Sequence, residues 1–148
     1  MKPENLLFTN ASMKEVRLAD FGSAVFSKDQ ALSYVASRFY RAPEIILRIT
    51  PYTPKVDIWA FGCILAELLS GQPLFPGSSE QVQLELIMEI CGNIPTSMIE
   101  KSPQKDVYFD TDGSPFLTEE EDQGILRIPD SKSLEDALGG EALGSETP

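Results

Sequence analysis

Apolar residues are spaced as in β-strands near the N-terminus and as in helices in the middle of the chain. Two short apolar runs at residues 6–8 and 16–19 enclose a polar stretch, and this arrangement predicts a β-hairpin. Residues 23–41 show no sustained period, as expected of an ordered loop. Pro43 then suits the start of a short helix that reaches about Ile49.

The strongest helix signal covers residues 54–70. Thr53 is a favourable N-cap, Pro54 suits the first helical position, and Gly71 suits the position just past the end. Apolar residues occupy nearly every side of this segment, so the helix should be buried all round at the centre of a larger domain. The rest of the chain offers too few apolar partners to cover it, which we take as a first sign of a fragment.

A second helix is predicted from Ser78 to about Cys91. Ser78 and Gln81 have the spacing of a capping box, and Gly92 supplies a stop signal. The apolar residues between these ends form a broad stripe, which indicates that one side of the helix packs on a core.

The net charge of −11 is concentrated toward the C-terminus. Residues 1–101 hold 9 Lys+Arg and 11 Asp+Glu, whereas residues 102–148 hold 3 and 12. Such acidity argues against binding to nucleic acid or to anionic membranes, because both require basic surface. Weak apolar clusters at residues 107–109 and 125–128 are expected to dock locally, and residues 137–148 are expected to be disordered.

Residue usage excludes several classes of site. The chain has no histidine, which excludes His-based zinc sites, Ser-His-Asp triads and Cys-His pairs. Cys63 and Cys91 fall inside the expected helices, so we predict buried free thiols and no disulfide or metal site. No stretch approaches the roughly 18 apolar residues of a membrane span, and the first residues do not resemble a signal peptide. We therefore expect a soluble intracellular protein, in the cytoplasm or nucleus.

Two polar motifs at the ends of the expected hairpin carry the candidate chemistry. Lys-Pro-Glu-Asn stands at residues 2–5 and Asp-Phe-Gly at residues 20–22. A hairpin between them would bring Asn5 and Asp20 to the same end, where both could hold one divalent metal that bridges the phosphates of ATP. Lys2 would add positive charge near the transferred phosphate. Each motif alone is weak evidence, because Asp-Phe-Gly is also a common turn tripeptide.

Two further motifs establish a family resemblance. Ala-Pro-Glu stands at residues 42–44 and Asp-x-Trp-x-x-Gly at residues 57–62, and the four motifs in this order resemble the eukaryotic protein kinase domain. The resemblance is strong over residues 1–101 and weak over residues 102–138. It implies a mainly α (α+β) fold, namely part of the C-terminal lobe of the protein-kinase-like fold with a short N-terminal β-hairpin and an acidic, partly disordered tail. We expect the partial kinase domain to cover residues 1–136.

The resemblance also implies roles for individual residues. Asn5 and Asp20 would bind Mg²⁺ and, through it, ATP. Lys2 would be the catalytic lysine that contacts the γ-phosphate and the region of the substrate hydroxyl. Glu44 would form a structural ion pair with an arginine beyond the chain, and Asp57 would brace the backbone of the catalytic loop.

The loop before the Ala-Pro-Glu motif narrows the resemblance to one group of kinases. Ser-Arg-Phe-Tyr-Arg at residues 37–41, preceded by Tyr34, resembles the CMGC group, and within it most closely the dual-specificity tyrosine-regulated kinases; a splicing-associated kinase is the nearest alternative. The resemblance implies that Tyr34 is phosphorylated by the enzyme itself. Arg38 and Arg41 lie four and seven residues after it, so we predict that their guanidinium groups clamp the phosphate. Alternatively, Tyr34 is a packed aromatic residue and both arginines pair with carboxylates. Arg41 is also linked in this group to substrates with Ser/Thr-Pro sites.

Several parts of the family's machinery do not occur in this sequence. The family reads His-Arg-Asp-Leu before the motif that starts at Lys2, and Met1 stands at the position of that leucine, so the catalytic-base aspartate is missing by one residue. The Gly-rich loop, the strand lysine and its glutamate partner are missing too. We therefore expect an inactive fragment of an ATP-dependent Ser/Thr or dual-specificity protein kinase. The alternative is a truncated product that acts as a binding module or decoy for kinase partners or substrates.

Overall fold

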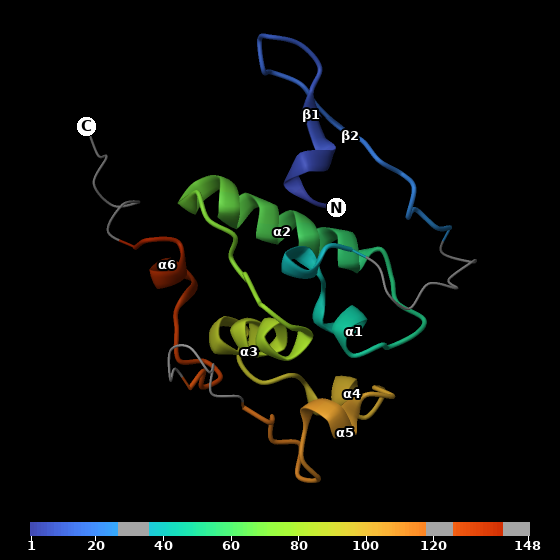
Figure 1. Ribbon diagram of the computed structural model, residues 1–148, viewed down its shortest axis with the longest axis vertical. Coiled ribbons are helices and arrows are strands. Elements are labelled where there is room, and N and C mark those ends of the chain that lie inside the picture. The colour runs from blue at the N-terminus through green and yellow to red at the C-terminus, as the bar shows by residue number, and fades with distance from the viewer. Residues whose placement is uncertain (27–35, 118–125, 141–148) are drawn as a thin grey trace.

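The computed structural model describes residues 1–26, 36–117 and 126–140. Figure 1 shows a two-stranded hairpin on one side of the long helix α2, with α1, α3, α4 and α5 on the other side. The strands are β1 (Leu6–Phe8) and β2 (Val16–Leu18), and short 3₁₀ turns occupy η1 (Pro3–Asn5) and η2 (Arg38–Tyr40). The helices are α1 (Pro43–Ile46), α2 (Lys55–Ser70), α3 (Glu80–Cys91), α4 (Thr96–Ile99), α5 (Lys105–Tyr108) and α6 (Leu134–Ala137).

The predicted hairpin is confirmed. Strands β1 and β2 pair antiparallel with Leu6 opposite Leu18 and Phe8 opposite Val16. The ladder continues past the strands, because the amide of Ala19 donates a hydrogen bond of 2.8 Å to the carbonyl of Asn5. The two chain segments that carry the polar motifs therefore leave the hairpin side by side.

Helix α2 confirms the helix predicted at residues 54–70 to within one residue, but its N-cap is Pro54 and not Thr53 as predicted. It ends at Gly71, whose φ of 76° lies in the left-handed region that glycine adopts without strain. One side of the helix is buried through Ala60, Cys63 and Ile64. The other side carries five apolar side chains that are 43–72% exposed within the described structure, so the helix is not buried all round. This exposed α2 row consists of Ile58, Phe61, Leu65, Leu68 and Leu69.

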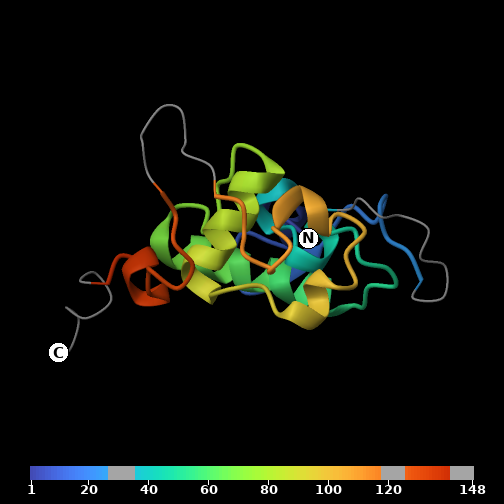
Figure 2. The same ribbon diagram turned by 90° about the horizontal axis from the view of Figure 1, so that it is seen from below.

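The core lies between α2 and the shorter helices, which face the viewer in Figure 2. Apolar side chains from α1, α2 and α3 form its centre, and the rings of Trp59 and Phe75 stack at its edge with centroids 5.9 Å apart. Its fully buried members include Ile46, Leu47, Ile64, Leu84, Ile87 and Met88.

Helix α3 begins one residue later than the predicted capping box requires. Ser79 is the N-cap, and its hydroxyl accepts a 3.1 Å hydrogen bond from the amide of Val82. The prediction of Ser78 as the capping residue is wrong, because the hydroxyl of Ser79 takes that role, while the carbonyl of Ser78 accepts from the guanidinium of Arg38. The predicted stop at Gly92 is confirmed by its φ of 79°.

The segment after Gly92 contains three one-turn helices, α4 to α6, that the sequence pattern did not reveal. The predicted docking of residues 107–109 is confirmed for Tyr108 and Phe109, which are 5% and 3% exposed in the core. Ala137 ends α6 and residues 138–140 follow it, whereas the rest of the tail expected to be disordered, residues 141–148, lies outside the described residues.

The cluster predicted at residues 125–128 docks mainly through the backbone that follows it. Leu126 and Ile128 remain 50% and 56% exposed. The amides of Asp130 and Lys132 donate to the carbonyls of Met88 and Glu89, at 2.9 and 3.1 Å. The segment therefore gives the Glu89 carbonyl a donor in the last turn of α3, whereas the Met88 carbonyl also accepts from the amide of Gly92 at the C-cap.

The two cysteines differ in environment. Cys63 is buried as predicted, whereas Cys91 is exposed because it is the last residue of α3. Both are free thiols, and burial raises the pKa of Cys63 to about 12. Among the described helices, none is both long and apolar enough to cross a bilayer.

Candidate active site

The structure brings Asn5 and Asp20 together at the open end of the hairpin. The side-chain amide of Asn5 donates to Oδ2 of Asp20 over 3.3 Å. This contact depends on the register of β1 and β2, since residues 5 and 19 are joined by the last backbone hydrogen bond of the ladder. The hairpin thus places the two candidate metal ligands as the sequence predicted.

The backbone of Asp20 helps to fix its carboxylate. Its φ of 60° lies in the left-handed region, which aspartate tolerates better than most residues. The amide of Gly22 donates to Oδ1 of Asp20 over 3.3 Å, so each carboxylate oxygen has one donor. The carboxylate is therefore held at the rim of the hairpin although the residue is exposed.

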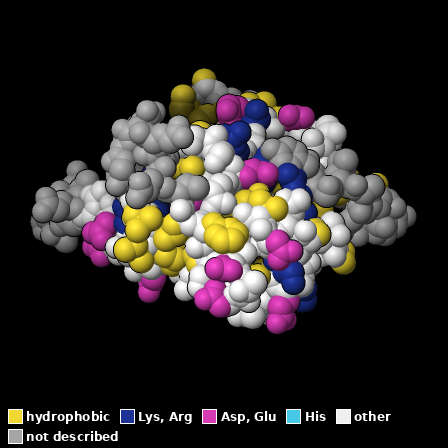
Figure 3. All heavy atoms as spheres, turned by 60° about the horizontal axis from the view of Figure 1, so that its bottom comes forward, with side chains coloured by type: hydrophobic (Ala, Val, Ile, Leu, Met, Phe, Trp, Pro, Cys, Tyr) yellow, Lys and Arg dark blue, Asp and Glu magenta, His cyan; other side chains and the backbone are white. Residues whose placement is uncertain are grey.

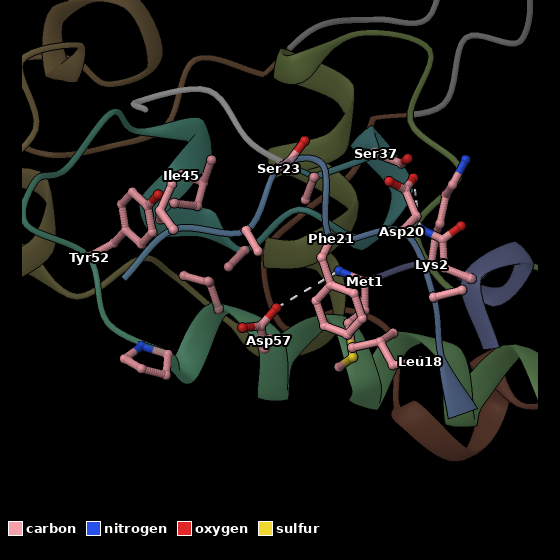
Figure 4. A pocket seen from close by; sticks show the side chains of 18 of the residues that line it. Met1, Lys2, Leu18, Asp20, Phe21, Ser23, Ser37, Ile45, Tyr52 and Asp57 are labelled. Atoms are coloured by element: carbon pink, nitrogen blue, oxygen red, sulfur yellow. Dashed lines mark hydrogen bonds and ion pairs between the residues drawn. The ribbon is translucent and has the colours of Figure 1, made fainter. Parts of the chain in front are cut away.

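A cavity of about 680 Å³ adjoins this pair. Its lining comes from the N-terminal residues, the Asp-Phe-Gly turn, the loop before α1 and the start of α2. Figure 4 shows Lys2 and Asp20 close together at one end of the cavity, with Asp57 farther along it. The α-ammonium of Met1 lies 3.9 Å from Oδ1 of Asp57, so Asp57 faces the residues just before Lys2.

The donor set at the rim fits a magnesium ion that shares its coordination with phosphate. Asp20 offers carboxylate oxygens and Asn5 an amide oxygen, and Mg²⁺ is commonly held by one or two carboxylates together with substrate phosphates and water. Within the described part of the chain, no group of three or more His, Cys, Asp or Glu residues could hold a metal ion. The rim therefore fits a metal that arrives with a nucleotide better than a permanent structural metal.

The loop that leads into α1 is anchored by charge. Arg41 is 3% exposed, and its guanidinium contacts Oε1 of Glu80 at 2.9 Å and the carbonyl of Ala36 at 2.9 Å. Arg48 contacts the other oxygen of Glu80 at 3.0 Å. One carboxylate at the start of α3 thus holds two arginines.

The predicted phosphate clamp is only partly within the described structure. Arg38 donates to the carbonyls of Gly77, at 3.3 Å, and of Ser78, and Arg41 pairs with a carboxylate. Tyr34 lies outside the described residues, so the clamp stays a prediction. Glu44 is half-buried in the first turn of α1, and its predicted ion pair stays a prediction.

Sequence reasoning missed three polar residues on helices that hold this loop, namely Glu67 on α2 and Glu80 and Gln83 on α3. The hydroxyl of Tyr40 donates to Oε2 of Glu67 over 2.7 Å, and burial together with this bond raises the pKa of Tyr40. Glu80 and Gln83 reach the loop from α3. The available signal was a glutamine between apolar neighbours on a helix, since a polar residue that must be buried requires hydrogen-bond partners.

Comparison with known proteins decides the family. A family model described as "Protein kinase domain" matches residues 1–130. This chain belongs to the protein kinase domain family. The kinase chain is 44% identical over 138 residues to the "Probable serine/threonine-protein kinase dyrk2" of Dictyostelium discoideum. The aligned region covers 93% of the chain and 15% of that protein. It is 41% identical over 134 residues to the human "Dual specificity tyrosine-phosphorylation-regulated kinase 4", covering 90% of the chain and 25% of that protein.

A third relative of the kinase chain is the "DYRK-family kinase pom1" of Schizosaccharomyces pombe, 45% identical over 140 residues, or 93% of the chain and 12% of that protein. The predicted resemblance to the CMGC group, and within it to the dual-specificity tyrosine-regulated kinases, is confirmed. The kinase chain spans only 12–25% of the length of these three relatives.

Proposed function

We propose that this kinase chain forms the metal-binding and peptide-binding part of an ATP-dependent protein kinase that phosphorylates Ser/Thr residues followed by proline. The contact between Asn5 and Asp20 at 3.3 Å carries the proposal, because it places two oxygen-bearing side chains at one edge of a cavity that Lys2 also lines. The printed names of the relatives, serine/threonine-protein kinase and dual specificity kinase, support the reaction type.

The residues at the rim of the hairpin would have different roles in binding ATP. Asp20 and Asn5 would hold Mg²⁺, and when bound this ion neutralises charge on the phosphates during transfer. The ammonium group of Lys2 lies near the same edge and attracts the anionic phosphoryl group toward the substrate side. The backbone ladder of the hairpin fixes the separation of the two ligands before the nucleotide arrives, which reduces the entropy lost on binding.

The peptide-binding role rests on the loop at residues 36–41. Ala36 has a φ of 70°, and its carbonyl already accepts a hydrogen bond from Arg41. A substrate amide that met this carbonyl would compete with a buried guanidinium. Proline has no amide hydrogen and leaves nothing unpaired there, so this geometry favours a proline after the phosphorylated residue.

The decisive experiment transplants the chain into a complete kinase. Residues 1–130 replace the corresponding segment of the human relative, dual specificity tyrosine-phosphorylation-regulated kinase 4, to give a protein that we call the chimera. We expect the chimera to transfer phosphate from ATP to a Ser-Pro peptide and to prefer it over the matched Ser-Ala peptide. Asp20→Ala should lower kcat at least about 100-fold, because it removes the metal-binding carboxylate.

The matched control is Asp106→Ala, which removes an exposed carboxylate on α5, far along the chain from the hairpin. It should leave kcat unchanged. A folded chimera without activity, or equal losses for the two alanine variants, would refute the proposed function.

A further inference from the structure

Gln83 is a polar residue at the centre of the buried face of α3. Its side chain is completely buried, with 0% exposure. Oε1 accepts a 3.1 Å hydrogen bond from the amide of Gly77, and Nε2 donates to the carbonyl of Phe39 in a longer contact of 3.5 Å. One side-chain amide therefore connects the loop before α3 to the peptide-binding loop, residues 36–41.

Gly77 lies unusually close to this glutamine. A Cβ atom at residue 77 would stand 2.6 Å from both the Cα and the backbone nitrogen of Gln83 and 2.7 Å from its Oε1. Backbone atoms at that distance cannot yield without moving the helix or the loop. The loop before α3 is thus pressed directly against the helix at Gln83, and glycine is required there.

Charged contacts act at the same junction. Arg38 donates to the carbonyls of Gly77 and Ser78, and Arg41 pairs with Glu80. These contacts also hold the peptide-binding loop against α3. The short, buried amide of Gln83 adds an uncharged link that joins the Phe39 carbonyl to the Gly77 amide.

We propose that Gln83 is a positioning residue for peptide substrates, and that the Gln83–Gly77 junction sets the place of the peptide-binding loop. The inference rests on the proposed function and adds a residue, outside the family motifs described above, that controls peptide affinity through the loop. Gln83 does not touch ATP-binding residues, so its effect is confined to the peptide.

The first test compares peptide and ATP kinetics in the chimera carrying Gln83→Met. Methionine has a similar length and no hydrogen-bonding amide, so the Phe39 carbonyl and the Gly77 amide lose their partner. We expect KM for the Ser-Pro peptide to rise about tenfold, as the loss of a buried hydrogen bond implies, with kcat within about twofold and KM for ATP unchanged. Gly77→Ala should raise the peptide KM in the same way, because the added methyl group forces the loop away from the helix.

The matched control is Gln81→Met on the same helix. Gln81 donates to Glu85 and to the carbonyl of Phe116, and contacts neither loop of the junction. Thermal midpoints of both variants are measured, so that a general loss of stability is recognised. Equal peptide KM values for the Gln83 and Gln81 variants would overturn the inference while leaving the proposed function intact. A folded but inactive parent chimera would instead refute the proposed function, and this inference would fall with it.

Amide hydrogen exchange on the chimera provides a second readout that needs no activity. The amide of Gly77 should exchange at least about tenfold faster in the Gln83→Met chimera than in the unmodified chimera, and Gln81→Met should not change it. Unchanged protection of Gly77 in Gln83→Met would show that the glutamine does not hold the loop.

Discussion

At the scale of single residues, the site is built from charges and amides that are shared between segments far apart in sequence. Glu80 serves both Arg41 and Arg48, and Asp20 receives donors from Asn5 and Gly22. Arg41 is nearly fully buried, so its charge is stable only while a carboxylate and a carbonyl remain beside it. The same arginine thus anchors the loop at residues 36–41 and, in the proposed function, shapes the site for the residue after the phosphoacceptor.

Cys63 gives a pH dependence that can be measured at this scale. Burial raises the pKa of Cys63 to about 12, whereas a thiol in an unfolded chain ionises near pH 9. Above about pH 9 the unfolded state loses this proton and the folded state keeps it, so the free energy of unfolding should fall by about 1.4 kcal/mol per pH unit until about pH 12. Cys63→Ala should remove the part of this slope that Cys63 contributes between pH 9 and 10, as measured by urea unfolding of the chimera.

Cys91→Ala is the comparison variant: burial raises the pKa of Cys91 too, but the residue is exposed, so its removal should take away a smaller part of the slope than removal of Cys63. If the two cysteine variants show the same slope as the parent, the alkaline loss of stability has another origin.

At the scale of elements, the sequence predicted those parts that depend on local signals. The hairpin, α2 and the stops at Gly71 and Gly92 follow from apolar spacing and from glycine, and all four are confirmed. The first residue of α3 was predicted wrongly because two adjacent serines, Ser78 and Ser79, both suit an N-cap, and the local pattern does not choose between them. The one-turn helices α4 to α6 were missed for a related reason, since a single turn forms only when tertiary contacts compensate its nucleation cost.

The corrected N-cap of α3 yields a test at this scale. Ser79→Ala removes the hydroxyl that accepts from the amide of Val82 and should destabilise the protein by about 1 kcal/mol. Ser78→Ala should change stability by less than about 0.5 kcal/mol, because only its carbonyl makes the contact described here. Thermal unfolding of the two variants in the chimera compares them directly. A larger loss of stability in Ser78→Ala than in Ser79→Ala would show that Ser78 is the N-cap, as the sequence pattern predicted.

At the scale of the whole molecule, the exposed α2 row and the acidic charge have opposite effects on solubility. The row presents five large apolar side chains from one helix, and exposed apolar areas of several hundred Å² promote association. On the face in Figure 3, Lys and Arg side chains are interspersed with Asp and Glu, and the described residues visible there form no broad basic area. The net charge of −11 opposes aggregation but cannot cover the apolar row.

Charge placed in the α2 row should therefore improve the behaviour of the isolated chain. We expect the unmodified 148-residue chain to elute largely as aggregate in size-exclusion chromatography. The double variant Ile58→Glu with Leu68→Glu, two residues that are 70% and 72% exposed, should raise the monomer fraction severalfold. Phe116→Glu adds a charge at a partly exposed position outside α2 and should do less. A monodisperse unmodified monomer with a sharp thermal transition would contradict this expectation.

Catalysis is the property that most depends on the whole molecule. The chain carries Lys2, Asn5 and Asp20, but its 148 residues include no Gly-rich loop and no catalytic-base aspartate before Lys2. Positioning of ATP and of the substrate hydroxyl supplies most of the rate enhancement in phosphoryl transfer, and two metal ligands cannot provide it alone. We therefore expect the isolated chain to transfer no more labelled phosphate from ATP to a Ser-Pro peptide than its Asp20→Ala variant does. The chimera, assayed in parallel, should show clear transfer. Activity of the isolated chain that Asp20→Ala abolishes would mean that these residues suffice for catalysis.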